Sequence, residues 1–585
     1  MHNKNKSIIS QALNAFRGAF FAAGIFSLFI NILVLTIPLY LLNVYTHVFA
    51  SMSVETLIML TIVAVGALVV QGLLEIIRSR VLVRVSAGID SRLGEAVLSS
   101  TISKAAGSAQ HSTQPMRDVN ELRGFLGGPD VFRLIDIPLI PVFVGVLYFF
   151  DPLLSMIALA GAIVLFALAI INQLVTQKPL NAMNDQSMQS FNRVDDYVRN
   201  ADVIKAMGMG AAITSRWQAE NFNKLQWLRK AADRAGTISS TAHFVRMLLQ
   251  VAIIGAGTYL YLQHEILAGT IIAASILMGR ALAPVESAIS TWKNVVSARS
   301  AYKRLVMLLE ESKQDEVNME LPAPEGRISL DRIIVADQRK ENIFLKNVGF
   351  EILPGEMLGI VGPSGAGKST LGKVLVGITS PSTGEIRLDG AELDHWDSTS
   401  LGKYIGYLPQ DVQLFGGTVA ENIARMNKDA NVSDIIAAAK LVGAHDLILR
   451  LPKGYETQVG EAGLALSSGQ RQHIGLARAY YGCPKLVVLD EPNANLDSES
   501  EFALLKGLSN ARQQKITQVV ITHRPSVLQS SDKMLMLKDG TMELFGPSDK
   551  VRERLLALRD SMSANSNKLG SGSAMSVSPI RQGNA

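Results

Sequence analysis

The sequence predicts a membrane α-helical bundle of six transmembrane helices, followed by a soluble α/β domain with a phosphate-binding loop. Three observations support this. The 585 residues are 48% hydrophobic and only 18% charged, and the mean hydropathy is +0.23. Six long apolar runs lie in the N-terminal half, whereas short apolar strands alternate with helical stretches and Gly-rich turns after about Gly326. A chain of this length exceeds one hydrophobic core, so at least two domains are expected.

Six apolar runs supply the membrane half. Each is close to the ~20 residues that a helix needs to cross ~30 Å of hydrocarbon. Several are apolar on all faces, which favours membrane spans over the helices of a soluble bundle, because those keep a polar face. The first run is too long for a cleaved signal peptide, and five more follow it. The runs are roughly Phe20–Leu42, Thr56–Leu74, Leu134–Phe150, which Pro138 and Pro141 interrupt, Leu153–Leu174, Phe244–Leu262 and Ala268–Ala288.

Between these runs, segments without Lys or Arg alternate with segments rich in both. Lys and Arg are missing from 43–55, from the turn 151–152 and from 264–265, but they are frequent in 78–123 and 178–234. This distribution predicts a cytoplasmic N-terminus, very short outer loops and two long cytoplasmic excursions. The helical patterning of the excursions predicts that the spans continue as helices beyond the bilayer. Loops of that length usually have a surface to contact.

Composition also sets the domain boundaries that we expect. A Ser-, Asn- and Gly-rich tail has almost nothing to bury, which predicts disorder there. The parts are a short cytoplasmic N-terminus (1–18), a transmembrane domain with six spans (19–310), a linker rich in charge and Pro (311–325), the α/β domain (326–560) and the tail (561–585).

Cysteine count and charge exclude several classes. The single Cys483 excludes an intramolecular disulfide framework and a multi-cysteine metal site. The net charge of +5 is small for this length and gives no support to nucleic-acid binding, so no nucleic-acid partner is predicted.

The phosphate-binding loop follows a short buried strand, Met357–Val361. The pattern is G-x-x-x-x-G-K-S/T. Its glycines let backbone N–H groups curl around phosphates, and the helix that follows points its positive end at the same anion. Lys368 would supply a point charge to the β- and γ-phosphates, and the Ser369 hydroxyl would ligate Mg²⁺. The motif consists of Gly362, Pro363, Ser364, Gly365, Ala366, Gly367, Lys368, Ser369 and Thr370.

A second motif, Lys485–Glu491, ends a predicted central strand in two carboxylates. Asp490, at the carboxyl end of the strand, can hold Mg²⁺. Glu491 is placed to orient or activate the attacking water as a general base. Together with the phosphate-binding loop, this motif predicts hydrolysis of ATP.

A third motif, Leu466-Ser467-Ser468-Gly469-Gln470, precedes the helical stretch Arg471–Tyr481. With it the chain resembles the ATP-binding cassette family, whose signature is usually written LSGGQ. Ser468 stands where the family has Gly. The resemblance implies that Ser467, Gly469 and Gln470 offer a helix N-terminus to the γ-phosphate held by Lys368 of a second subunit.

The same resemblance implies further roles. Gln410 looks like the Q-loop glutamine that senses Mg²⁺ and water, and His523 looks like the switch histidine that contacts the γ-phosphate. Asn495-Leu496-Asp497 resembles the D-loop that crosses the dimer interface, and Val459-Gly460-Glu461 resembles the loop that touches coupling helices in exporters. Many cassettes stack adenine on an aromatic residue that would fall at 335–337, but Val335-Ala336-Asp337 has none.

The membrane half resembles one branch of this family, the PrtD-like protease/lipase exporters of type I secretion. The resemblance runs from about Phe20 to Arg559. It implies a homodimer in the bacterial inner membrane, with cytoplasmic ATPase domains. The partners it implies are a periplasmic adaptor (membrane fusion protein), an outer-membrane channel, a secreted protein with a C-terminal signal and the lipid bilayer. The segments that carry it are Pro38–Tyr45, Asp136–Pro141, Asn200–Met209, Arg280–Glu286 and Pro492–Asp497.

Two questions stay open at this stage. A lipid or drug exporter on the same architecture is the alternative function, and a regulator or gated channel is a further one. Four ionisable residues in or near the spans either line the polypeptide pathway or pair between helices. They are Asp136, Arg246, Arg280 and Glu286. By analogy with exporters, Arg117–Phe125 and Ala206–Thr214 are expected to couple the spans to the ATPase domain.

Overall fold

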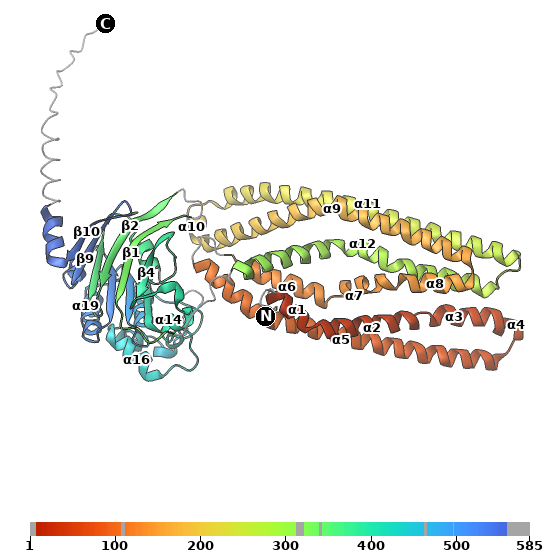
Figure 1. Cartoon of the computed structure of the whole chain (residues 1–585), viewed down its shortest axis with the longest axis horizontal. Helices are drawn as coiled ribbons and strands as arrows, with labels where there is room; N and C mark the ends of the chain where they lie inside the picture. The colour runs from red at the N-terminus through yellow and green to blue at the C-terminus, as the bar shows by residue number, and fades with distance from the viewer. Residues whose placement is uncertain are drawn as a thin grey trace, which may run out of the picture. The chain divides into compact units, whose positions relative to one another are not determined.

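The computed structural model describes residues 8–106, 112–311, 321–337, 342–460, 465–494 and 496–557. The chain divides into two compact units, Met1–Gln314 and Asp315–Ala585. The first is helical and the second is α/β (Figure 1). Most of the predicted linker and all of the predicted tail lie outside the described residues.

Six helical segments of the described chain are long and apolar enough to cross a membrane. The predicted order of six spans followed by an α/β domain is therefore confirmed. The spans are Arg17–Ser51, Val54–Ala106, Pro129–Phe150, Pro152–Arg199, Gly210–Leu262 and Ala268–Glu311. The helices before, within and between them are α1 (Ile8–Ala15), α2 (Arg17–Leu33), α3 (Thr36–Asn43), α4 (Phe49–Ser51), α5 (Val54–Ala106), α6 (Gln114–Gly127), α7 (Pro129–Asp136), α8 (Ile140–Phe150), α9 (Pro152–Arg199), α10 (Ala201–Ala206), α11 (Gly210–Leu262) and α12 (Ala268–Glu311).

Helices α5, α9 and α11 are much longer than a bilayer is thick. At 53 residues, α11 extends for about 80 Å. The spans thus continue as helices, as the loop patterning predicted. Helices α9 and α11 run alongside each other (Figure 1), and the Arg234 guanidinium donates to the Val175 carbonyl across this pair at 3.2 Å.

Local sequence explains the breaks between the spans. The tight turn before α9 forms because the Asp151 side chain accepts from the Leu153 N–H at 2.7 Å and Pro152 occupies the first helical turn. Pro138 and Pro141 lack an N–H, so the third span is split into α7, a 3₁₀ turn at Ile137–Leu139, and α8.

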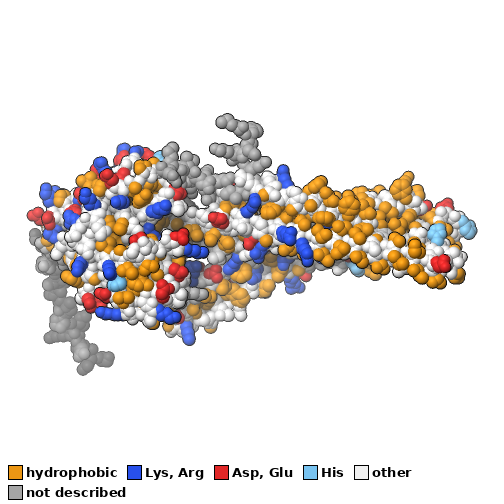
Figure 2. Space-filling model, turned by 90° about the horizontal axis from the view of Figure 1, so that it is seen from below, with side chains coloured by type: hydrophobic (Ala, Val, Ile, Leu, Met, Phe, Trp, Pro, Cys, Tyr) orange, Lys and Arg blue, Asp and Glu red, His pale blue; other side chains and the backbone are white. Residues whose placement is uncertain are grey.

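The core of the helical unit lies where α8, α9, α11 and α12 meet. Its largest buried side chains include Phe143, Leu147, Leu165, Ile253 and Leu277. Many large apolar side chains on the outer faces are exposed instead, as expected for lipid-facing helices. Figure 2 shows these hydrophobic side chains covering the right-hand part of the helical unit, with Lys and Arg gathered nearer its other end.

Three of the four ionisable residues singled out in the spans have partners on other helices. Asp136 lies 3.6 Å from Arg78 and accepts from the Asn31 amide at 3.0 Å. Glu286 lies 3.1 Å from Arg246. These contacts favour pairing between helices for Asp136, Arg246 and Glu286. Arg280 is exposed and makes no hydrogen bond or ion pair with the described part of the chain.

Helix α6 is fixed to α12 by a buried ion pair. Asp118 is 1% exposed. It accepts from Nε and Nη2 of Arg304 at 2.8 and 2.7 Å. The Gln114 amide adds a third bond to Asp118 at 2.8 Å. Because a buried carboxylate is stable only when paired and hydrogen-bonded, the two bonds from Arg304 hold α6 against α12, while the Gln114 bond, within α6, gives Asp118 a further partner.

The α/β unit is built on two sheets. The larger has the order β10-β9-β3-β8-β7-β6, parallel except for β10, and the smaller is antiparallel with the order β2-β1-β4-β5. Every residue of β7 and β8 is buried, which is typical of central strands covered on both faces. The strands are β1 (Ile328–Ala336), β2 (Ile343–Ile352), β3 (Met357–Val361), β4 (Thr383–Leu388), β5 (Ala391–Glu392), β6 (Ile405–Leu408), β7 (Leu486–Asp490), β8 (Thr517–Ile521), β9 (Lys533–Lys538) and β10 (Thr541–Pro547).

Helices cover these sheets (Figure 1). They are α13 (Lys368–Leu375), α14 (Ser398–Tyr404), α15 (Val419–Ile423), α16 (Val432–Leu441), α17 (His445–Leu449), α18 (Ser468–Tyr480), α19 (Ser498–Gln513) and α20 (Pro525–Leu528). One apolar core includes side chains of α13 with β3 and β8, and another includes side chains of α16, α18 and α19.

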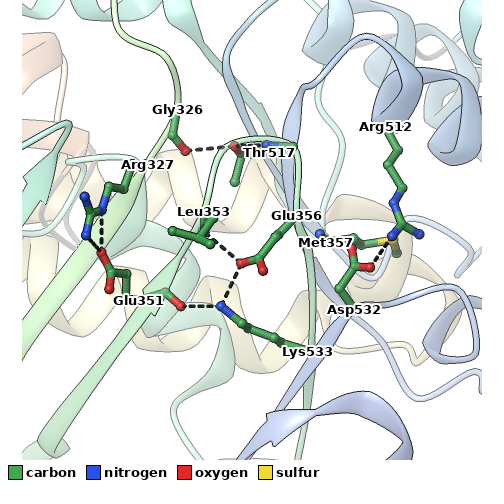
Figure 3. A network of polar contacts seen from close by, with 11 residues as sticks. Gly326, Arg327, Glu351, Leu353, Glu356, Met357, Arg512, Thr517, Asp532 and Lys533 are labelled. Atoms are coloured by element: carbon green, nitrogen blue, oxygen red, sulfur yellow. Dashed lines mark hydrogen bonds and ion pairs between the residues drawn. The ribbon is translucent and has the colours of Figure 1, made fainter.

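A polar network closes the amino ends of the parallel strands (Figure 3). The Lys533 ammonium, at the start of β9, donates to the Glu356 carboxylate at 2.7 Å and to the Glu351 carbonyl at 3.2 Å. Arg512 pairs with Asp532, whose other oxygen accepts from the Met357 N–H. These bonds give hydrogen-bond partners to the polar groups at the amino ends of the strands. The loops that carry the motifs lie at the opposite, carboxyl edge of the sheet.

Candidate ATP-binding and catalytic site

The phosphate-binding loop joins the carboxyl end of β3 to α13. Gly365 and Gly367 have φ of +79° and +93°, which a residue with a Cβ rarely adopts. A Cβ on Gly367 would also lie only 2.8 Å from the Phe344 carbonyl oxygen. The backbone therefore curls tightly before α13, leaving the N–H groups of the first helical turn as anion donors.

Lys368 lies inside this curl and is 8% exposed. Its ammonium donates to the carbonyls of Gly362 and Pro363 at 2.7 and 2.9 Å. Burial lowers the pKa of Lys368 from its usual value, while the negative charges of Glu491 and Asp490 act against that shift. A phosphate in the loop would supply further negative charge to this partly desolvated cation.

Asp490 ends β7 beside the loop and is 2% exposed. Burial raises the pKa of its carboxyl above the ordinary value, and a hydrogen bond with Ser369 opposes that rise. A buried carboxylate next to a hydroxyl suits Mg²⁺, which binds proteins through one or two oxygen ligands and takes the rest from phosphates and water. The described residues contain no cluster of three or more His, Cys, Asp or Glu that could hold a metal.

Glu491 follows Asp490 with a left-handed backbone, φ +50°. Its N–H donates to the Ile521 carbonyl of β8 at 2.9 Å. Its carboxylate accepts from the Gln410 amide at 3.4 Å and lies 4.0 Å from Nε2 of His523. The carboxyl ends of β6, β7 and β8 therefore bring the three predicted catalytic residues together, with Glu491 at their centre.

The signature residues form the N-terminus of α18. Ser467 is the N-cap: its hydroxyl accepts from the Gln470 N–H at 3.2 Å, and the Gln470 side chain accepts from the Ser467 N–H at 2.9 Å. In this capping box both side chains hydrogen-bond to backbone N–H groups at the start of α18. Ser467 and Ser468 are exposed. Within the described residues, no hydrogen bond or ion pair joins Ser467, Gly469 or Gln470 to the phosphate-binding loop of the same chain.

Two predicted loops are only partly described. Asn495, in the predicted D-loop, and Glu461, in the predicted exporter loop, lie outside the described residues. Asp497 caps α19 by accepting from the Ser500 N–H at 2.9 Å. Val459 is buried, and its N–H donates to the Gly417 carbonyl at 2.8 Å.

Sequence reasoning missed an aromatic residue beside the phosphate-binding loop. Phe344, on β2, is 46% exposed. Its carbonyl lies so close to Gly367 and Gly540 that neither position has room for a Cβ. No aromatic occurs at Val335–Asp337, but β2 pairs with that strand. The pairing of the two strands could have drawn attention to Phe344.

Sequence reasoning also missed three buried polar residues close to the motifs. Gln472 lies one turn into α18 and donates to the carbonyls of Glu491 and Pro492. Thr522 precedes His523 and bonds with Asn493. Each lies within two positions of a motif residue, but only the fold shows what it contacts.

Comparison with known proteins gives a consistent result. The family model described as "ABC transporter" matches residues 345–494, and the "ABC transporter transmembrane region" matches residues 20–284. The chain is 38% identical to the type I secretion system ATP-binding protein PrsD of Rhizobium meliloti, over 93% of this chain and 94% of that protein. It is 28% identical to the cyclolysin secretion/processing ATP-binding protein CyaB of Bordetella pertussis, over 90% and 74%.

A leukotoxin translocation ATP-binding protein, LktB of Mannheimia haemolytica, is 29% identical over 90% of this chain and 75% of that protein. Among solved structures, a bacterial Atm1-family ABC exporter with ATP bound aligns with a TM-score of 0.81 at 22% identity. That alignment covers 96% of this chain and 99% of the exporter. At this identity the match concerns the fold alone.

Proposed function

This chain belongs to the ABC transporters, among the ATP-binding proteins of type I secretion systems, and on that premise we propose that it exports a protein across the inner membrane with energy from ATP hydrolysis. The supporting observation is the 38% identity over nearly the full length of both this chain and a type I secretion ATPase. The chain is a multi-pass membrane protein with an ATPase domain. Its N-terminus and ATPase domain face the cytoplasm, because Lys and Arg gather in the segments on that side.

The working unit is a homodimer. One chain carries one phosphate-binding loop and one signature motif. The N-terminus of α18 is exposed and, within the described residues, makes no hydrogen bond with the chain's own phosphate-binding loop, so a second copy would receive its N–H groups. Two chains together would supply two complete ATP sites and twelve spans.

Each residue of the site has a role in hydrolysis. Backbone N–H groups of residues 362–370 and Lys368 bind the β- and γ-phosphates. Ser369, Asp490 and Gln410 would hold Mg²⁺, which neutralises phosphate charge when bound. Glu491 accepts a proton from the attacking water, and His523, whose Nε2 lies 4.0 Å from the Glu491 carboxylate, contacts the γ-phosphate.

The partners follow from the same assignment. A periplasmic adaptor and an outer-membrane channel would continue the path, and the cargo would carry a C-terminal signal. The segments that couple ATP hydrolysis to the spans are Arg117–Phe125, in α6, and Ala206–Thr214, around the turn before α11.

The test uses the full chain reconstituted in nanodiscs. We expect ATPase activity that changes on addition of a C-terminal cargo peptide and that Glu491→Gln reduces at least about 100-fold. Glu491→Gln should still bind ATP, because its phosphate contacts remain. A response to lipids or drugs with none to any cargo peptide would instead support a lipid or drug exporter. Export by Glu491→Gln at the wild-type rate would contradict the proposal.

Arg280 is the one intramembrane charge for which we propose a place on the polypeptide pathway. It is exposed and makes no hydrogen bond or ion pair with the described residues, whereas Arg246 pairs with Glu286. We expect Arg280→Ala to lower secretion without loss of protein, and Arg246→Ala to lower stability because Glu286 would lose a partner. Unchanged secretion with lowered stability in Arg280→Ala would place Arg280 among structural pairs instead.

A further inference from the structure

The short segment after β7 carries Glu491 and is held from two sides by buried side chains. On one side, the Gln472 amide of α18 donates to the Pro492 carbonyl at 3.0 Å and to the Glu491 carbonyl at 3.4 Å. Gln472 is 1% exposed, so water cannot replace it. Its two bonds go to the backbone of the predicted general base and of the next residue.

On the other side, Asn493 is joined to the strand that leads to His523. The Thr522 hydroxyl donates to Oδ1 of Asn493 at 3.0 Å and accepts from the Arg524 N–H at 3.1 Å. Both Asn493 and Thr522 are buried. The two bonds of Thr522 bracket His523, because they fix the backbone on either side of it.

Glu491 needs such support because of its backbone. Its φ of +50° lies in the left-handed region, which is unfavourable for a residue with a Cβ. Such a conformation persists only where neighbouring contacts over-determine it. The Ile521 carbonyl holds the N–H of Glu491, and Gln472 holds its carbonyl. Together they set the direction in which the carboxylate leaves the backbone.

We infer that Gln472 and the Asn493–Thr522 pair are positioning residues for ATP hydrolysis: Gln472 ties Glu491 to the helix that begins at Ser467, and Thr522 ties His523 to the same segment. This rests on the proposed ATPase function. It has a consequence for the dimer, since α18 begins with the residues that would meet the other copy's γ-phosphate. A shift of α18 would be transmitted to Glu491 of the same chain through the side-chain amide of Gln472.

The first experiment compares two buried glutamines. Gln472→Met keeps the volume and removes the donor. Gln518→Met is the matched control, because Gln518 is equally buried and also donates to a carbonyl, that of Leu508, while accepting from Tyr480. Both variants should lose similar thermal stability. Only Gln472→Met should lower kcat, by about 10- to 100-fold, with KM for ATP within about twofold of wild type.

The second experiment separates the Thr522 hydroxyl from the shape of the residue. Thr522→Val is nearly isosteric and removes the hydroxyl, whereas Thr522→Ser keeps it. We expect Thr522→Val to lower kcat about tenfold and Thr522→Ser to recover most of that loss. Binding of ATP in the presence of EDTA, where hydrolysis cannot proceed, should be the same in all variants.

The outcomes separate this inference from the proposed function. If wild-type chain hydrolyses no ATP, the proposed function fails. If wild type is active but Gln472→Met keeps its kcat, or loses kcat only as much as Gln518→Met does, Gln472 is structural and the inference is wrong. Equal losses in Thr522→Val and Thr522→Ser would overturn the part that concerns His523.

Discussion

The ion pair between α6 and α12 leads to a quantitative prediction. Asp118→Asn keeps the size of the side chain but removes its charge and one acceptor. Breaking a buried pair costs about 3–5 kcal/mol. The Arg304 side chain is 32% exposed and can regain water, while that of Asp118 is 2% exposed and cannot. We therefore expect α6 to lose about 2 kcal/mol of local stability.

Hydrogen–deuterium exchange of the α6 amides, Gln114–Gly127, measures this loss directly. A loss of about 2 kcal/mol corresponds to about 30-fold faster exchange. The matched control is Arg123→Gln, on the same helix, because its 3.4 Å pair with Asp90 is solvent-exposed on both sides. It should change exchange about twofold at most. Exchange in Asp118→Asn within twofold of wild type would show that the pair does not fix α6.

Three shorter predictions concern the α/β unit. Phe344→Ala should raise KM for ATP about fivefold and leave kcat unchanged, because the adenine base would lose about 1 kcal/mol of stacking on the phenyl ring. An unchanged KM would mean that the adenine base binds elsewhere. Glu356→Gln, at the edge of the sheet opposite the site, should lower stability by about 1–2 kcal/mol through its bond with Lys533, while kcat stays at the wild-type value in steady-state assays. Cys483 is exposed, so maleimide should label the native chain once and Cys483→Ser not at all, and labelling only after denaturation would contradict the exposure.

The sequence predicted the features that depend on neighbours along the chain. The glycines before Lys368 and the apolar run before Asp490 describe local geometry, so the loop and the strand follow from them. The six spans follow from hydrocarbon thickness and helix rise. The structure adds the form of the break that Pro138 and Pro141 predicted in the third span, because Ile137–Leu139, which contains Pro138, tightens to a 3₁₀ turn.

Features that depend on distant neighbours could not be predicted. Asp118 and Arg304 are 186 positions apart, and either alone is typical of a solvated helix face. Gln472 lies two positions after the signature motif, yet nothing in its neighbourhood indicates that it bonds to residues 19 and 20 positions later. The left-handed backbone of Glu491 could not be predicted either, because glutamate rarely adopts this conformation and only contacts made in the fold impose it.

The length of α9 and α11 has a mechanical consequence. The two helices form a stiff hairpin whose bend lies at Asn200–Met209, and Gly161 lets Leu249 approach the α9 backbone closely, so the arms do not slide freely. A rod of about 80 Å that pivots by about one degree at one end sweeps about 1.4 Å at the other. Small rotations at the bend are thereby amplified into displacements of more than an ångström at the far end of the hairpin.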